Sequence, residues 1–303
     1  MSDPLNGVTR LPQLGVIAAQ GPDAAVFLQG QLTQDFAGLD ASQARLAAYC
    51  TAKGRMLASF VGFARADGEI LLVIDRAILA PTLKRLSMFV LRSKVKLRDA
   101  SAEVDVYGLA GQAAADTVAQ EPWRCRQSAG TSFISLYSAD GSPRALCVQT
   151  AGAAMPAGES LGQDLWQWGE VRSGIAMITP PIVEAFVPQM LNYESVGGVN
   201  FKKGCYPGQE VVARSQFRGT LKRRAYLAHS QAPLQAGQEL FRESETSQPC
   251  GMVAQAAAAP QGGWDAIVSM QVAAAQEGAI NTGGMQPAAV NVMPPPYLLL
   301  ADV

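Results

Sequence analysis

Lys202-Lys-Gly-Cys-Tyr-Pro-Gly-Gln-Glu210 is the most specific stretch in this chain of 303 residues. Pro207 fixes φ near the value that the second position of a β-turn needs, and Gly208 supplies the positive φ that a type II turn requires next. The following residues, 209–218, are typical of a short amphipathic helix. The stretch therefore predicts a turn that leads directly into a helix, with Cys205 just before its N-terminus.

The same region concentrates positive charge. Between residues 202 and 224 seven Lys/Arg residues stand against one acid, a local excess of +6, although the whole chain carries −1. Cations and a helix N-terminus both favour a thiolate, so we expect a lowered pKa for the Cys205 thiol. This makes Cys205 a candidate nucleophile or transient sulfur or metal ligand. A half-buried turn cysteine that only packs is the alternative.

Composition narrows the function classes. A hydrophobic content of 49% with 16% charged residues is ordinary for a globular protein with a large core. The five cysteines are widely separated, without a Cys-x-x-Cys pair, and there is one histidine. We therefore expect reduced thiols and no resident zinc or iron-sulfur ligand set. The N-terminus lacks a signal-peptide pattern and no apolar run approaches 18 residues, so we expect a cytoplasmic protein.

Strand and helix patterns alternate along the first 225 residues. Apolar runs at 45–49, 56–64 and 69–74 predict a three-strand meander. A helix over 77–91 and a strand over 95–98 are expected next. A weaker recurrence of the pattern predicts strands at 103–109, 131–137 and 144–150 and helices at 112–120 and 164–172. This order favours an α+β fold with antiparallel sheets over a doubly wound parallel sheet. From Arg224 onward short apolar runs between Pro and Gly clusters predict a small all-β module.

The segment KGCYPGQE, followed by VVAR and FRGTLKRR, resembles the signature of the folate-binding YgfZ family. That family is related to the glycine-cleavage T protein, an aminomethyltransferase, and to the mitochondrial assembly factor for iron-sulfur clusters. Residues 21–35, 52–55 and 186–201 carry further likeness. The resemblance spans roughly residues 14–226.

The resemblance implies a ring-like fold around a central channel that holds tetrahydrofolate. It divides the chain into a folate-binding α+β region over 1–225, made of two interleaved subdomains, and a C-terminal β-barrel over 226–303. In the family a tryptophan at the position of Trp166 lies against the ligand, and a second one is replaced here by Leu14. Arg172 and Arg218 are the candidate groups for the anionic part of a folate. We expect Cys205 at the mouth of the folate cavity.

The resemblance leaves enzymatic activity open. In the aminomethyltransferase an aspartate of the first hairpin region positions the folate nitrogen, and a glutamate two residues before the equivalent of Gly174 grips the pterin. Here Arg172 occupies the glutamate position, and no aspartate lies between Asp40 and Asp67. The expected catalytic carboxylates are therefore missing at those positions.

We accordingly expect a tetrahydrofolate-binding protein that acts in iron-sulfur cluster assembly or repair, with tRNA-modifying iron-sulfur enzymes among its beneficiaries. Cys205 would be its reactive centre. The residues expected to shape the surroundings of this thiol are Lys203, Tyr206, Gln209, Glu210 and Arg214. The residues expected to supply an anion-binding field are Lys202, Arg218, Lys222 and Arg223.

Two alternatives stay open at this point. One is a folate-dependent one-carbon transferase, and the other is a non-catalytic scaffold that docks partners through the Cys205 turn. We expect folate and iron-sulfur assembly or client proteins as partners, with no direct nucleic-acid or membrane binding, and a monomer. The stretch 84–98 holds six Lys/Arg and no acid, a pattern that suggests RNA but is more typical of a solvated face.

Overall fold

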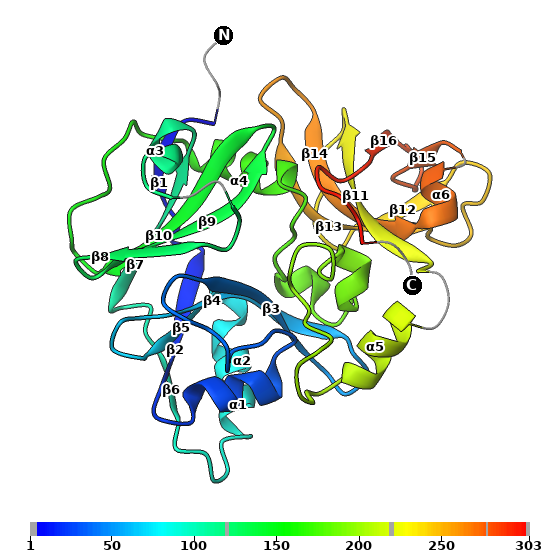
Figure 1. Ribbon diagram of the computed structural model, residues 1–303. Coiled ribbons are helices and arrows are strands. Elements are labelled where there is room, and N and C mark those ends of the chain that lie inside the picture. Colours follow the sequence, from blue (N-terminus) through cyan, green and yellow to red (C-terminus); the bar gives the residue numbers. More distant parts are fainter. Residues whose placement is uncertain (1–4, 119–120, 218–220, 277, 301–303) are drawn as a thin grey trace.

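The computed structural model describes residues 5–118, 121–217, 221–276 and 278–300. Two five-stranded antiparallel sheets and a closed barrel make up the molecule (Figure 1). These three bodies surround a common centre. The fold is therefore α+β with antiparallel sheets and a C-terminal barrel, as expected from the sequence.

The first sheet has the strand order β3-β4-β5-β2-β6. Its strands are β2 (Leu14–Gln20), β3 (Ala44–Cys50), β4 (Met56–Ala64), β5 (Ile70–Asp75) and β6 (Lys96–Asp99). Most of their apolar side chains are buried, and the predicted meander is confirmed. Helices α1 (Ala24–Gln31) and α2 (Arg76–Ser87) lie beside this sheet at the edge of the molecule in Figure 1. The Asp75 carboxylate caps α2 by accepting the Ala77 amide.

The second sheet has the order β1-β7-β10-β9-β8. Its strands are β1 (Gly7–Arg10), β7 (Val104–Ala110), β8 (Cys125–Ser128), β9 (Thr131–Ala139) and β10 (Ser142–Thr150), and its helices are α3 (Gln112–Ala115) and α4 (Gln163–Arg172). The chain enters this sheet with β1 and then crosses to the first sheet with β2. The first strand of the chain therefore belongs to the second sheet, and the next strand belongs to the first sheet.

The barrel closes in the order β11-β14-β13-β12-β15-β16. Its elements are β11 (Arg223–Ser230), β12 (Glu239–Arg242), β13 (Gly251–Ala258), β14 (Trp264–Gln271), α6 (Val272–Gln276), β15 (Ile280–Asn281) and β16 (Ala289–Met293). It has its own buried apolar cluster. The division of the chain at residue 225 stays a prediction.

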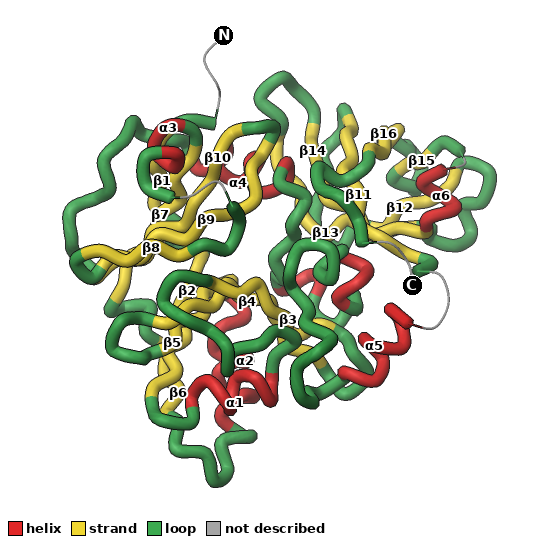
Figure 2. Tube along the Cα trace, in the orientation of Figure 1, coloured by secondary structure: helices red, strands yellow, loops and turns green. Residues whose placement is uncertain are grey.

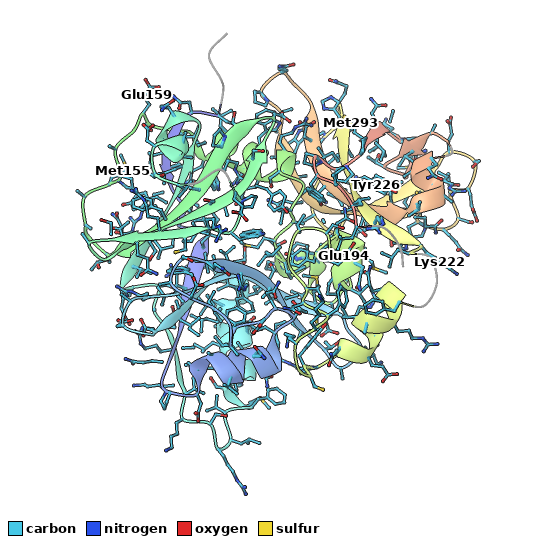
Figure 3. All side chains as sticks on the ribbon, in the orientation of Figure 1. Met155, Glu159, Glu194, Lys222, Tyr226 and Met293 are labelled. Atoms are coloured by element: carbon cyan, nitrogen blue, oxygen red, sulfur yellow. The ribbon has the colours of Figure 1, made fainter. Side chains whose placement is uncertain are left out.

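Long loops connect the second sheet to the barrel. They contain the short 3-10 helices η1 (Pro180–Ile182) and η2 (Pro188–Leu191) and then α5 (Gln209–Phe217). Figure 2 shows these loops between the first sheet and the barrel. Glu194, in the loop after η2, lies near the centre of the molecule, whereas Met155 and Glu159 lie at its outer edge (Figure 3). Among the described residues no helix has the length and apolar content needed to cross a membrane.

Two helices are shorter than the sequence predicts. The helix expected over 77–91 ends at Ser87, because the next residues include the exposed Met88 and Leu91, which have no apolar face to cover. The helix expected over 112–120 is α3 alone within the described residues. There the Thr117 hydroxyl donates to the carbonyls of Ala113 and Ala114, and such side-chain bonds compete with helix propagation.

Candidate functional site

The Cys205 loop has the predicted turn and helix. The Gln209 amide donates to the Tyr206 carbonyl at 3.1 Å, and Gly208 has φ of +84°. A side chain at position 208 would place its Cβ 2.4 Å from the Thr51 carbonyl oxygen. Only glycine fits this contact, which joins the cysteine segment to the hairpin between β3 and β4. Of the predicted site residues, Arg218 lies outside the described residues.

Lys203 lies beneath this loop and is nearly buried. Its ammonium donates to the Gln29 carbonyl of α1 and to the Gly204 carbonyl, and it lies 4.4 Å from the centre of the Tyr206 ring. Burial lowers the pKa of Lys203 to about 8, while Asp35 and Cys205 act against this shift. The loop is thus tied to α1 by a cation whose charge is only partly compensated.

Cys205 is exposed, in contrast to the other four cysteines of the chain. Burial raises the pKa of Cys50 and Cys147 to about 12 and that of Cys125 to about 11, and it also raises that of Cys250. Those four thiols are therefore protonated and shielded at neutral pH. Cys205 is the thiol that another molecule can reach.

The remaining residues predicted around Cys205 differ in how far they are buried. Tyr206 is buried, Gln209 is half-buried, and Glu210 and Arg214 are exposed on α5. Glu210 and Arg214 form no ion pair with each other or with another of the described residues. The structure therefore brings Lys203 and Tyr206 under the thiol and leaves the two charged residues of α5 in solvent.

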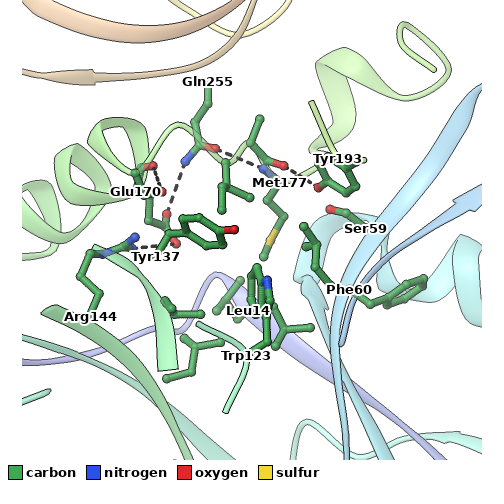
Figure 4. A pocket seen from close by; sticks show the side chains of 17 residues that line it. Leu14, Ser59, Phe60, Trp123, Tyr137, Arg144, Glu170, Met177, Tyr193 and Gln255 are labelled. Atoms are coloured by element: carbon green, nitrogen blue, oxygen red, sulfur yellow. Dashed lines mark hydrogen bonds and ion pairs between the residues drawn. The ribbon is translucent and has the colours of Figure 1, made fainter. Parts of the chain in front are cut away.

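A separate cavity lies where the two sheets, the barrel and the central loops meet (Figure 4). It encloses about 570 Å³, which includes part of its opening. Its wall is mostly apolar, and a larger, amide-rich hollow shares Leu14, Glu170, Met177 and Gln255 with it. The lining residues of the cavity are Leu14, Leu46, Ser59, Phe60, Val61, Trp123, Leu136, Tyr137, Arg144, Leu146, Glu170, Ser173, Ile175, Ala176, Met177, Tyr193 and Gln255.

One end of the cavity carries a polar cluster. The Arg144 guanidinium lies 4.0 Å from the Glu170 carboxylate, and the Gln255 amide donates to Glu170 at 3.4 Å. Burial raises the pKa of Glu170, and Arg144 opposes that shift. Burial likewise lowers the pKa of Arg144 to about 10, opposed by Glu170. Figure 4 shows this cluster beside the Tyr137 ring. The cavity can therefore offer a charged acceptor and several donors to the edge of a flat heterocycle.

Aromatic side chains form part of the wall. The Tyr137 ring lies 5.9 Å from Trp123 and 5.8 Å from Tyr297, centre to centre. The Trp123 indole is fixed because its N–H donates to the Val196 carbonyl at 2.8 Å. Glu170, Tyr137 and Trp123 were missed by the sequence analysis. The Trp-x-Trp-Gly-Glu run of α4 was its only available signal, and it pointed to the tryptophans rather than to Glu170.

The expected folate contacts are only partly brought together. Leu14 lines the cavity. Trp166 is fully buried behind the cavity wall, with the Arg144 guanidinium 4.3 Å above its ring. Arg172 forms a bidentate ion pair with Asp140 at 2.8–3.0 Å, lies 3.7 Å from the Asp265 carboxylate, and is not among the lining residues. Arg144, rather than Arg172, is the arginine of the cavity.

Cys205 and the cavity are separated. No residue of the Cys205 loop or of α5 is among the lining residues. On the cavity side lies Tyr193, whose hydroxyl donates to the Ala176 carbonyl at 2.6 Å. Cys205 therefore does not line this cavity, although the sequence analysis expected it at the mouth.

Sequence comparisons place these features in context. A protein of Colwellia psychrerythraea called "tRNA-modifying protein YgfZ" is 30% identical over 233 residues, which cover 73% of this chain and 71% of that protein. One of the same name from Photorhabdus laumondii is 34% identical over 240 residues, covering 71% and 68%. The chain belongs to the YgfZ family. No family model matches the chain.

The fold is also similar to a solved structure. The glycine cleavage aminomethyltransferase T of Bartonella henselae superposes with a TM-score of 0.70 at 16% identity, covering 96% of this chain and 86% of that one. At this identity the likeness shows the fold alone. This YgfZ-family chain therefore has an aminomethyltransferase-like architecture, with the central cavity and the exposed Cys205 loop as its two candidate sites.

Proposed function

We propose that this protein binds tetrahydrofolate in the central cavity and acts in the cytoplasm in the assembly or repair of iron-sulfur clusters, on which tRNA-modifying enzymes depend. The observation that carries the proposal is the pairing of two sites in one YgfZ-family fold: a shielded cavity and an exposed thiol. The cluster is cargo in this proposal. Among the described residues no group of three His, Cys, Asp or Glu side chains could hold a metal ion.

The cavity residues fit a reduced folate. A pterin needs flat apolar walls, which Trp123 and Tyr137 supply, and a hydrogen-bonding edge, which Glu170 and Gln255 supply. The adjoining hollow leaves room for the glutamate tail, and its side-chain amides can donate to the tail, although its lining includes the Asp75 and Glu170 carboxylates and no Lys or Arg. A bound folate would supply a one-carbon carrier. The residues of this chain would hold and orient it and keep water from its ring.

The Cys205 loop fits a transient sulfur ligand. Its sulfur is exposed, Lys203 places a cation beneath it, and the backbone of the turn is fixed by Gly208. A thiolate in that place can bind iron, or take the outer sulfur of another protein's persulfide as the donor cysteine leaves as thiolate. Cys205 would therefore react with a group on another protein, while the cavity binds the folate.

The test replaces Cys205 by Ala in a strain that depends on this gene. We expect the activity of iron-sulfur tRNA-modifying enzymes to fall to that of the deletion strain, while the purified variant keeps its melting temperature and its affinity for tetrahydrofolate. Cys125→Ala, a buried thiol, is the matched control. Full enzyme activity with Cys205→Ala would remove the assembly role.

A second candidate function is folate-dependent aminomethyl transfer, and one observation favours it. Glu170 provides a half-buried carboxylate whose pKa is raised by loss of solvent inside the cavity, although not at the position where the sequence analysis sought one. Such a group can hold and move a proton. Formation of methylene-tetrahydrofolate from an aminomethyl-lipoyl donor, lost in Glu170→Gln, would support this function; no product with the wild-type protein would remove it.

A further inference from the structure

The tip that follows α2 exposes several apolar side chains to solvent. Leu91 is 84% exposed and Met88 is 68% exposed, and Phe89 is 43% exposed. Between them Val90 packs against the core. The Phe89 amide donates a hydrogen bond to the Leu86 carbonyl and the Val90 amide donates one to the Ser87 carbonyl, so the backbone is fixed. The tip is therefore a preformed apolar surface.

Cations surround this tip. None of them forms an ion pair with another described residue, whereas Arg98 further along pairs with Glu69 and Glu103. The exposed cations are Lys84, Arg85, Arg92, Lys94 and Lys96. An apolar centre with a positive rim complements a surface that has an apolar depression rimmed by carboxylates.

Helix α1 links the tip to the Cys205 loop. At its N-terminus the Asp23 carboxylate accepts the Lys94 amide at 2.6 Å, and near its C-terminus the Gln29 carbonyl accepts from Lys203. Eight residues of helix span about 12 Å. Between these two ends Val26 is 68% exposed. Helix α1 therefore lies between the tip and the Cys205 loop, and its length sets the distance between them.

We infer that this face, formed by residues 84–96, Val26 and the Cys205 loop, docks a protein whose surface offers carboxylates around an apolar depression, and that docking there brings the partner's reactive site to Cys205. The inference rests on the proposed role of Cys205 and names the chemistry of its partner. The tip anchors the partner and its basic rim steers the approach.

A protein fits this face better than RNA or an anionic membrane. Bases stack on aromatic side chains, and one apolar side chain of this face, Phe89, is aromatic, whereas Met88, Leu91 and Val26 are aliphatic and offer no stacking surface. In addition, the charge changes along the face, since Asp35 interacts with Lys203 and Glu210 is exposed beside the Cys205 turn. A phosphate backbone or an anionic bilayer presents one sign of charge everywhere, whereas a protein surface can match both the cations of the tip and the Glu210 carboxylate along this face.

The test places the photo-crosslinker p-benzoylphenylalanine at position 91 of the full chain in cells, with position 285 as the control. Met285 is fully exposed between β15 and β16 of the barrel. We expect one defined protein adduct at position 91 and none at 285. The protein identified is then purified and titrated. Leu91→Glu should weaken its binding about tenfold or more, and Met285→Glu should not. Arg92→Glu should slow association and reduce its salt dependence.

Two further probes decide between partner classes. Total tRNA in filter binding and vesicles of phosphatidylglycerol and phosphatidylethanolamine in sedimentation are tested with wild type and Leu91→Glu. Binding of either probe that Leu91→Glu removes, or absence of an adduct at position 91, overturns the inference. An adduct that persists while Cys205→Ala keeps full activity leaves docking standing and removes the proposed function. The reverse result, no adduct with an inactive Cys205→Ala, removes docking alone.

Discussion

The central cavity and the Cys205 loop are built in opposite ways. The cavity collects side chains from both sheets and the barrel, and its buried Arg144 faces the half-buried Glu170. The Cys205 loop takes its thiol, its cation and its aromatic ring from four consecutive residues, and its sulfur is exposed. The first arrangement suits a small ligand held out of water, and the second suits a group that meets another protein. Mutations should therefore separate the two roles.

Arg144→Met should have the largest effect and should affect the cavity alone. The substitution leaves the half-buried Glu170 without its cation and removes the guanidinium from the Trp166 ring. We expect the free energy of unfolding to fall by about 2 kcal/mol, less than for a fully buried pair because Glu170 keeps some contact with solvent. Urea denaturation measures it, with Arg214→Gln as the exposed control. A loss no larger than that of the control would contradict the buried pairing.

Tyr137→Ala should weaken tetrahydrofolate binding next. Tyr137 lines the cavity between Trp123 and Tyr297, so its loss removes a flat apolar wall. We expect the dissociation constant to rise about tenfold, which corresponds to about 1.4 kcal/mol. Isothermal titration gives the constant, and alkylation of Cys205 by iodoacetamide serves as the internal control and should keep its rate. Equal affinity of wild type and variant would place the folate elsewhere.

Glu170→Gln should change affinity less but alter the pH dependence. We expect tetrahydrofolate affinity to fall about fivefold, because the charged acceptor becomes an amide. The folded-state pKa of Glu170 is raised by burial. Its contribution to stability is therefore present at low pH and is lost as pH rises above the ordinary glutamate range. Melting curves over pH should show this decline in wild type and a flatter profile in the variant; parallel profiles would refute it.

Lys203→Met should act on the Cys205 loop alone. Without the cation we expect iodoacetamide to alkylate Cys205 about threefold more slowly. Because the folded pKa of Lys203 is lowered to about 8, the unfolded chain binds more protons above that pH, and wild type should gain stability relative to the variant as pH rises from 8 toward the ordinary lysine range. Paired unfolding measurements at pH 7 and pH 9.5 test the sign. A wild-type advantage that shrinks would be the opposite result.

Arg214→Gln should have the smallest effect. Arg214 is exposed on α5 and no ion pair holds it within the described part of the chain. We expect less than a twofold change in tetrahydrofolate affinity and in Cys205 alkylation. A large loss of cellular activity with both measurements unchanged would assign Arg214 to a partner contact instead.

Local chemistry explains what the sequence could predict. Pro207 and Gly208 define their turn by backbone geometry alone, and the apolar runs of β3, β4 and β5 require a half-buried meander. Both predictions were confirmed. The end of α2 was placed too late because the apolar residues after Ser87 continue a helical spacing but face solvent.

The cavity could not be predicted in the same way. Glu170, Tyr137 and Gln255 meet only because the barrel strand β13 packs beside α4 and β9 of the second sheet, and no spacing in the chain connects them. The contact from Lys203 to Gln29 likewise joins residues 174 positions apart. The resemblance to the YgfZ family supplied the fold, whereas the lining had to come from the structure.

Calorimetric titration of tetrahydrofolate into wild type, Cys205→Ala and Tyr137→Ala, under identical reducing conditions, tests the separation of the two sites most directly. We predict equal affinity for wild type and Cys205→Ala and weaker binding by Tyr137→Ala. Binding that disappears with Cys205→Ala, or that is absent from the wild-type protein, would contradict the account.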